Sequence, residues 1–196
     1  MPGMPLPSGT DSKGLRKALP ELEKKHPWFS HLLNAYIFLD ASLRRELTPL
    51  DRQPACAAGC AACCNQPIPL SLAESMGIQL FLREVDPIFS AAEKPEESPP
   101  WRCPFLVSGI CAVYPVRPFA CRRFLVFSHP CTAGEDPLAT RPEDVHKPSA
   151  ASLLRAQQLT LPVYKGLGYG VEENAGTEFF KKYSTLVQNI PWAKPF

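Results

Sequence analysis

The feature that most constrains this chain is the placement of its cysteines. All eight lie between positions 56 and 131 of a 196-residue sequence, and the flanking segments contain none. Ordinary core packing does not require such clustering, whereas metal and redox chemistry does, because several thiols must act together. The distribution therefore predicts a local chemical centre, and a bound metal is its first interpretation.

The first half of this segment is a short loop that reads C-A-A-G-C-A-A-C-C over residues 56–64. Its small alanine and glycine residues let the backbone curl tightly around a bulky ligand. Cys63 and Cys64 are neighbours, so their side chains diverge, and one of them is expected to face a second metal or the packed interior. The remaining thiols follow at longer intervals and belong to Cys103, Cys111, Cys121 and Cys131.

The loop triplet Cys56, Cys60 and Cys63 favours an iron–sulfur cluster, with a [4Fe–4S] cubane as the first candidate. Thiolates select zinc, Cu(I) or iron–sulfur clusters, and closely spaced cysteine triplets are common in cluster-binding proteins. The fourth thiolate of such a cluster is expected from a remote position, such as Cys103, Cys111 or Cys121. Zinc stays open as the alternative, because zinc sites take four thiolates each and two of them also use eight thiols.

A buried thiolate centre of either kind carries a net charge near −2 and needs cations or donors beside it. Arg117 and Arg122 lie within four residues of Cys121 in the sequence. Guanidinium groups keep their charge and offer several donors, so we predict that these two arginines contact the cofactor. The alternative is that both are ordinary surface residues.

The combined cysteine pattern resembles the YkgJ-type CxxCxxCC family. The pattern continues after the loop as Cys-Pro-Phe-Leu, Gly-x-Cys and Tyr-x2-Arg-Pro-x2-Cys-Arg-x-Phe, over residues 55–131. One spacing departs from the family name, since three residues rather than two separate Cys56 from Cys60. The matching residues are Cys56, Cys60, Cys63, Cys64, Cys103, Pro104, Phe105, Leu106, Gly109, Cys111, Tyr114, Arg117, Pro118, Cys121, Arg122 and Phe124. The resemblance implies a zinc- or iron-chelating domain.

The rest of the chain predicts a mainly α-helical fold. Apolar residues at steps of three and four after Pro27 predict a helix that Pro49 ends. Ser71 and Glu74 form a capping-box pattern, which predicts a helix over 72–85. A turn after Pro118 is expected to carry Cys121. Further expectations are a hairpin of 105–107 against 110–113, a helix over 152–159 and a turn-rich link over 164–170.

The last predicted helix begins at a Thr177 cap and extends to about Ile190. Residues 1–20 are expected to be a tail, and residues 91–100 and 132–148 to be loops. Residues 21–196 are expected to form one domain with its cysteine core at 55–131. The predicted fold is thus a small helical domain around an irregular cysteine-rich metal centre, with at most a short β-hairpin.

Composition excludes several classes of function. A net charge of +2 gives no field for nucleic acid, and no apolar run reaches the roughly 20 residues of a membrane helix. The N-terminus lacks the layout of a signal peptide, so we expect a cytoplasmic protein. A disulfide-stapled secreted domain is disfavoured for the same reason.

Two functional hypotheses remain. The first is a metal-binding protein with a redox, iron-handling or structural role, and with a redox protein as its partner. The second is a protein-modifying, methyltransferase-like enzyme that carries the cluster as an accessory centre, because similar clusters accompany flagellin lysine N-methylases. The four histidines are scattered and form no acid–base constellation. We therefore favour the metal-binding role without enzymatic activity.

Overall fold

The computed structural model describes residues 20–50, 52–56, 60–84, 102–107, 109–132, 134–190 and 192. The predicted tail lies outside these residues except for residue 20, and the predicted loop over 91–100 lies wholly outside them. All eight cysteines are among the described residues.

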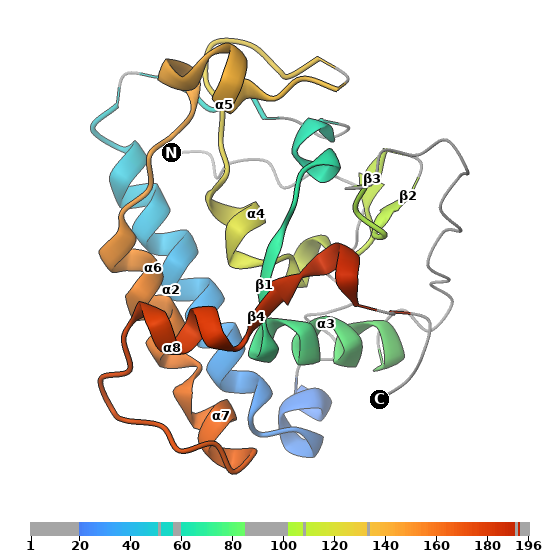
Figure 1. The fold of residues 1–196 in the computed structure, drawn as a ribbon, viewed down its shortest axis with the longest axis vertical. Coiled ribbons are helices and arrows are strands. Elements are labelled where there is room, and N and C mark those ends of the chain that lie inside the picture. Colours follow the sequence, from blue (N-terminus) through green and yellow to red (C-terminus); the bar gives the residue numbers. More distant parts are fainter. Residues whose placement is uncertain are drawn as a thin grey trace.

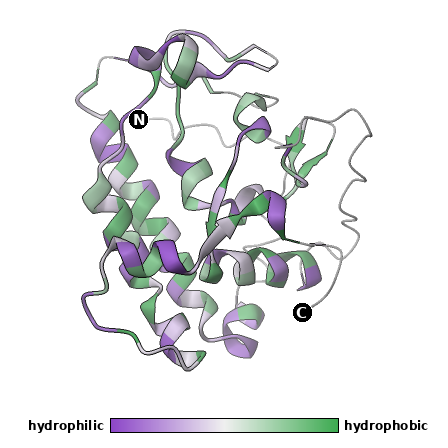
Figure 2. Ribbon diagram, in the orientation of Figure 1, coloured by the Kyte–Doolittle hydropathy of each residue, from purple (hydrophilic) through white to green (hydrophobic). Residues whose placement is uncertain are grey.

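Helix α2 (Phe29–Leu47) is confirmed and runs between Pro27 and Pro49. Figure 1 shows it beside helix α6 (Ala150–Leu159), against which it packs. Hydrophobic and hydrophilic residues alternate along α2 (Figure 2), as in a helix with one face on the core. Its buried side chains follow the predicted periodicity and are Phe29, Leu32, Ala35, Tyr36, Leu39, Ser42 and Leu43.

Helix α3 (Leu72–Glu84) begins at the predicted capping box. The Ser71 backbone N–H donates to Glu74 Oε2 at 2.9 Å, and the Glu74 N–H donates to Ser71 Oγ at 3.3 Å. Further along, a Cβ at Gly77 would come within 2.2 Å of Leu32 Cδ2. A residue without a side chain is therefore required where α3 crosses α2.

The hairpin and the turn after Pro118 are also present. Strands β2 (Leu106–Val107) and β3 (Ile110–Cys111) pair antiparallel, with Leu106 opposite Cys111. The 3₁₀ turns η1 (Ala62–Asn65) and η2 (Tyr114–Val116) lie on either side of them in the sequence. Helix α4 (Phe119–Arg123) follows Pro118 and carries Cys121.

The end of the chain differs from the prediction. Helix α8 (Thr177–Lys182) stops early, and strand β4 (Ser184–Leu186) pairs antiparallel with strand β1 (Pro69–Ser71), followed by η4 (Val187–Asn189). The helix to Ile190 is therefore wrong, because a strand partner more than 110 residues away overrides the local pattern. The fold also has this second small sheet beyond the one hairpin that was expected.

Two smaller corrections concern helix boundaries. Helix α7 (Leu161–Gly166) occupies part of the predicted turn-rich link, with Pro162 in its first turn, where a missing N–H costs nothing. The N-cap of α8 is Gly176, and no side chain caps that helix, so the Thr177 cap is wrong. Helix α5 (Pro137–Thr140) and η3 (Pro142–Asp144) interrupt the predicted loop over 132–148.

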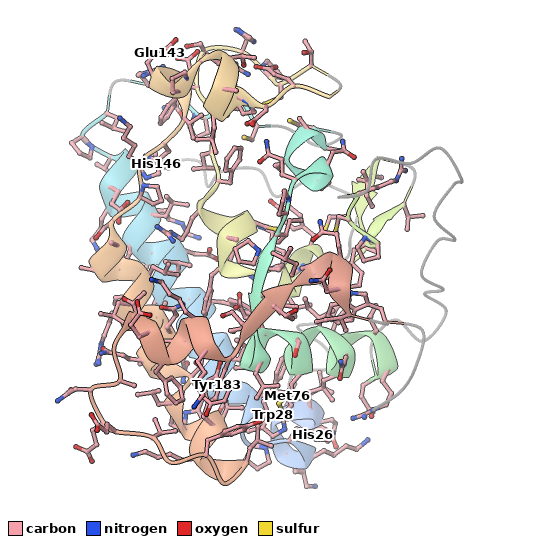
Figure 3. All side chains as sticks on the ribbon, viewed as in Figure 1. His26, Trp28, Met76, Glu143, His146 and Tyr183 are labelled. Atoms are coloured by element: carbon pink, nitrogen blue, oxygen red, sulfur yellow. The ribbon has the colours of Figure 1, made fainter. Side chains whose placement is uncertain are left out.

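The mainly helical class is confirmed, and the described residues have two hydrophobic clusters. The larger cluster joins α2, α3, η2 and α4. The smaller one surrounds the buried Tyr164, and Trp28, Met76 and Tyr183 pack against it. Figure 3 places these three at the end of the molecule opposite Glu143. Among the described helices, none has the length and apolar character needed to cross a bilayer.

Candidate metal centre

The eight cysteines are free thiols contributed by separate parts of the chain. Cys63 and Cys64 lie on η1, Cys111 on β3 and Cys121 on α4. The other four lie in irregular segments and are Cys56, Cys60, Cys103 and Cys131. Their surroundings show which of them the fold brings together.

Cys64 and Cys103 are tied by both backbone and side chain. The Cys103 N–H donates to the Cys64 carbonyl oxygen at 2.7 Å. The Cys64 thiol donates to the Cys103 sulfur, and this hydrogen bond is the main cause that raises the pKa of Cys64 to about 12. The Cys63 thiol in turn donates to Cys64, and this bond together with burial raises the pKa of Cys63 well above its ordinary value.

Cys111 and Cys121 approach the same place from the hairpin and from α4. The hairpin returns the chain, and the Ala112 N–H donates to the Phe105 carbonyl at 2.9 Å. Burial raises the pKa of Cys111 and, more strongly, that of Cys121. The neighbouring charges of Cys63, Cys64 and Cys111 also raise the pKa of Cys121, so these thiols lie within electrostatic range of one another.

Cys56 lies against a different segment. The Ala55 N–H donates to the Val126 carbonyl at 2.8 Å, and the Val126 N–H donates to Cys56 Sγ at 3.4 Å. Burial is the main cause that raises the pKa of Cys56, and the nearby Cys60 and Cys63 add to it. The start of the cysteine loop is therefore attached to the stretch that leads to Cys131.

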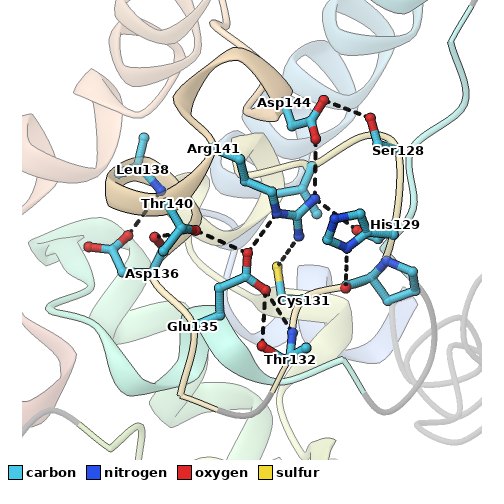
Figure 4. Close-up of polar contacts among 12 residues, drawn as sticks. Ser128, His129, Cys131, Thr132, Glu135, Asp136, Leu138, Thr140, Arg141 and Asp144 are labelled. Carbon is cyan, nitrogen blue, oxygen red and sulfur yellow. Dashed lines mark hydrogen bonds and ion pairs between the residues drawn. The ribbon is translucent and has the colours of Figure 1, made fainter.

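Arg141 lies at the centre of the polar contacts in the stretch that leads to Cys131 (Figure 4). Its guanidinium forms an ion pair with Glu135 at 2.6 Å and lies 3.5 Å from an Asp144 oxygen. It also donates to the carbonyl oxygens of Phe127 at 3.1 Å and His129 at 3.0 Å. The side chain of Arg141 is only 8% exposed, so these partners satisfy a buried charge.

The third nitrogen of this guanidinium, Nη2, donates a hydrogen bond to Cys131. Arg141 Nη2 lies 3.5 Å from Cys131 Sγ. Burial, followed by the charge of Cys60, raises the pKa of Cys131 to about 11, and Arg141 acts in the opposite direction. Arg141 was not predicted from the sequence, because it lies ten residues beyond Cys131, whereas the predicted arginines lie within four residues of a cysteine.

The two arginines predicted to bind the cofactor occupy different positions. Arg122 is buried, forms an ion pair with Asp40 at 2.8 Å and stacks over the Tyr36 ring at 4.0 Å. It also donates to the carbonyl oxygens of Arg117 at 3.0 Å and Pro115 at 2.6 Å, which fixes the turn before α4.

Arg117 stacks on the ring of Tyr114, with its guanidinium carbon 3.9 Å from the ring centre. Burial raises the pKa of both Cys111 and Cys121, and the charge of Arg117 opposes that increase at each of them. The positively charged guanidinium of Arg117 therefore lies within electrostatic range of the thiols of Cys111 and Cys121. A role of Arg117 and Arg122 in binding a cofactor remains a prediction.

Glu74 has a second role besides capping. Its Oε1 accepts the Phe119 N–H at 2.6 Å, while Oε2 accepts from the backbone and hydroxyl of Ser71. One buried carboxylate thus joins the start of α3 to the start of α4. Since α4 carries Cys121, Glu74 positions that thiol indirectly.

The donor chemistry of this region suits a soft metal ion or a cluster. Free thiols become thiolates when a metal displaces their protons, so raised thiol pKa values are compatible with such a centre. Within the described part of the chain, no three Cys, His, Asp or Glu side chains already form a ligand group. Ligation would therefore require the thiols to turn toward a common point.

A comparison with family models identifies this region. Residues 55–144 match CxxCxxCC, described as a "putative zinc- or iron-chelating domain". The match covers 90 of the 196 residues of the chain. The match includes all eight cysteines and also Arg141, and it confirms the family resemblance of the motif. This description supports metal binding by the cysteine-rich region. No curated protein and no solved structure matched the chain.

Proposed function

We propose that this protein binds an iron–sulfur cluster through the thiolates of its CxxCxxCC domain, in a redox or iron-handling role. The proposal rests on eight free thiols that separate segments of the chain supply, several of which lie within electrostatic range of one another. The loop triplet Cys56, Cys60 and Cys63 supports a cluster, because three thiolates from one loop can ligate three irons. The setting we propose is cytoplasmic, with a redox protein as partner.

The residues of this chain would supply ligands and charge compensation. The cysteine thiolates would hold the iron, and the cluster would supply one-electron chemistry. Arg141 donates to the sulfur of Cys131, and such contacts to a ligand sulfur shift the potential of a centre. Arg117 adds a second positive charge near Cys111 and Cys121.

The deciding experiment measures iron, zinc and acid-labile sulfide per chain in protein purified without oxygen, with a visible spectrum of the same sample. The proposal expects about four irons per cluster, a matching amount of sulfide, and a visible band that bleaches on reduction. Zinc without sulfide or colour would reject the cluster and leave a zinc-thiolate protein. A preparation that binds neither metal would reject both.

Metal binding is expected to release protons and to weaken as the pH falls. The raised pKa values of Cys64 and Cys131, about 12 and about 11, keep both thiols protonated at pH 7 in the metal-free protein. Each ligating thiol must then lose one proton, so affinity rises with pH by up to about four orders of magnitude per unit for a four-thiol site. Zinc calorimetry in two buffers of different ionisation enthalpy measures the release.

Protein with alkylated thiols is the control and should show neither binding nor proton release. Zinc binding by the native protein without proton uptake by the buffer would contradict thiolate ligation.

A further inference from the structure

We infer that the eight thiols form two separate four-thiol metal sites. The outer site consists of Cys56, Cys60, Cys63 and Cys131. The inner site consists of Cys64, Cys103, Cys111 and Cys121. This inference rests on the proposed metal binding and specifies how the ligands divide. It also assigns the fourth ligand of the loop triplet to Cys131 rather than to Cys103, Cys111 or Cys121.

Packing separates the inner set. Cys103 is a buried member of the larger hydrophobic cluster, and Cys64, Cys111 and Cys121 pack against the same cluster. The backbone bond between Cys103 and Cys64 and the pairing of Cys111 with Leu106 hold these thiols around that point. Four thiolates at the edge of this cluster would satisfy a tetrahedral metal without any ligand from solvent.

The outer set lies along the stretch from Val126 to Cys131. The Val126 backbone makes two hydrogen bonds to the start of the cysteine loop: its carbonyl accepts the Ala55 N–H, and its own N–H donates to the Cys56 sulfur. Ser128, with φ of 64°, then turns the chain. Arg141 contacts the Cys131 sulfur at the end of the turn, and Cys60 and Cys56 are among the charges that act on Cys131.

The boundary between the two sites falls between Cys63 and Cys64. Both lie on the 3₁₀ turn η1, in which successive side chains point about 120° apart. The backbone of Cys64 is bonded to Cys103, so Cys64 belongs to the inner set. Cys63 lies next to it and between the two sets, because its charge acts on Cys56 and also on Cys111 and Cys121. Since the inner set already has four thiols, we assign Cys63 to the outer set.

Each set also has its own guanidinium. Arg141 contacts the outer set through Cys131 at 3.5 Å. The charge of Arg117 acts on Cys111 and Cys121 of the inner set and also on Cys63. Since a four-thiolate site around a divalent ion has a net charge of −2, two sites require two sources of positive charge, and the structure places one at each.

The first test titrates metal-free protein with Zn²⁺ and counts bound ions by native mass spectrometry. Zinc suits both sets, because it binds thiolates whatever ion they hold in the cell. Wild-type protein should bind two ions. Cys131→Ser should lose only the outer ion and Cys121→Ser only the inner one. Alkylation of zinc-loaded Cys131→Ser should then spare Cys64, Cys103, Cys111 and Cys121.

The second test does not depend on removing a ligand. Arg141→Gln should weaken the outer ion about 10- to 100-fold, the usual effect of losing a group that orients a ligand, and leave the inner ion unchanged. Arg52→Gln is the matched control, because Arg52 shares Asp144 with Arg141 and also bonds Ser128 but contacts no cysteine sulfur. It should leave both ions unchanged. Competition with a chromophoric zinc chelator measures both affinities.

The outcomes separate this inference from the proposed function. One ion per chain, lost in both cysteine variants, would overturn the two-site division while metal binding stands. Alkylation of Cys103 or Cys111 in the zinc-loaded Cys131→Ser variant would also overturn it. If the wild-type protein binds no metal under any condition, both proposals fail.

Discussion

Replacing Glu74 by alanine is expected to lower the free energy of unfolding by about 3 kcal/mol. The change removes a carboxylate that accepts buried N–H groups of Ser71 and Phe119, and each orphaned buried donor costs about 1–3 kcal/mol. Burial also raises the pKa of Glu74, so part of this gain is offset by desolvation of the charge. Chemical denaturation at pH 7 measures the difference.

Glu84→Ala on the same helix is the control. Glu84 pairs with Arg83 and Lys25 at the surface, where such pairs contribute little, so its loss should leave the free energy of unfolding nearly unchanged. Because Glu74 also holds the start of α4, the Glu74 variant should in addition bind metal less tightly at Cys121. Equal stabilities of the two variants would contradict the role of Glu74 in joining α3 to α4.

Metal removal is expected to lower the melting temperature by about 8–16 °C. A ligand present at a thousandfold excess over its Kd stabilises the folded state by about 4 kcal/mol, and in a chain of this size each kcal/mol shifts the midpoint by about 2–4 °C. The segments that carry Cys56, Cys60 and Cys131 should account for the loss, because none of these three thiols is among the described residues of either hydrophobic cluster. Thermal unfolding followed by circular dichroism, with and without chelator, measures the shift.

Helicity at low temperature should survive metal removal. Phe29, Leu32 and Ile78 are fully buried in the larger hydrophobic cluster, and these apolar contacts between α2 and α3 do not depend on a metal at the thiols of the same cluster. A double variant, Cys131→Ser with Cys121→Ser, is the control and should melt at the same temperature with or without chelator. A native protein that is equally insensitive would contradict a metal contribution to stability.

Features formed by neighbouring residues were predictable from the sequence. The periodic apolar residues of α2 and the Ser71–Glu74 capping box are confirmed, since both depend on contacts within one or two helical turns. The cysteine motif also identified the family, because its spacing is a property of the chain alone. These patterns carry their information within a short stretch of sequence.

Tertiary structure decided what depends on distant partners. The segment from Ser184 to Leu186 carries a helical pattern but pairs with β1, and only the chain path brings them together. The same holds for Arg141, whose contact with Cys131 requires the turn at Ser128 and the ion pair with Glu135. Local sequence thus determined that this chain carries clustered thiols on a helical framework. The contacts of those thiols, such as Cys64 with Cys103 and Cys131 with Arg141, were decided by long-range packing, because burial and hydrogen bonding arise only when separate segments meet.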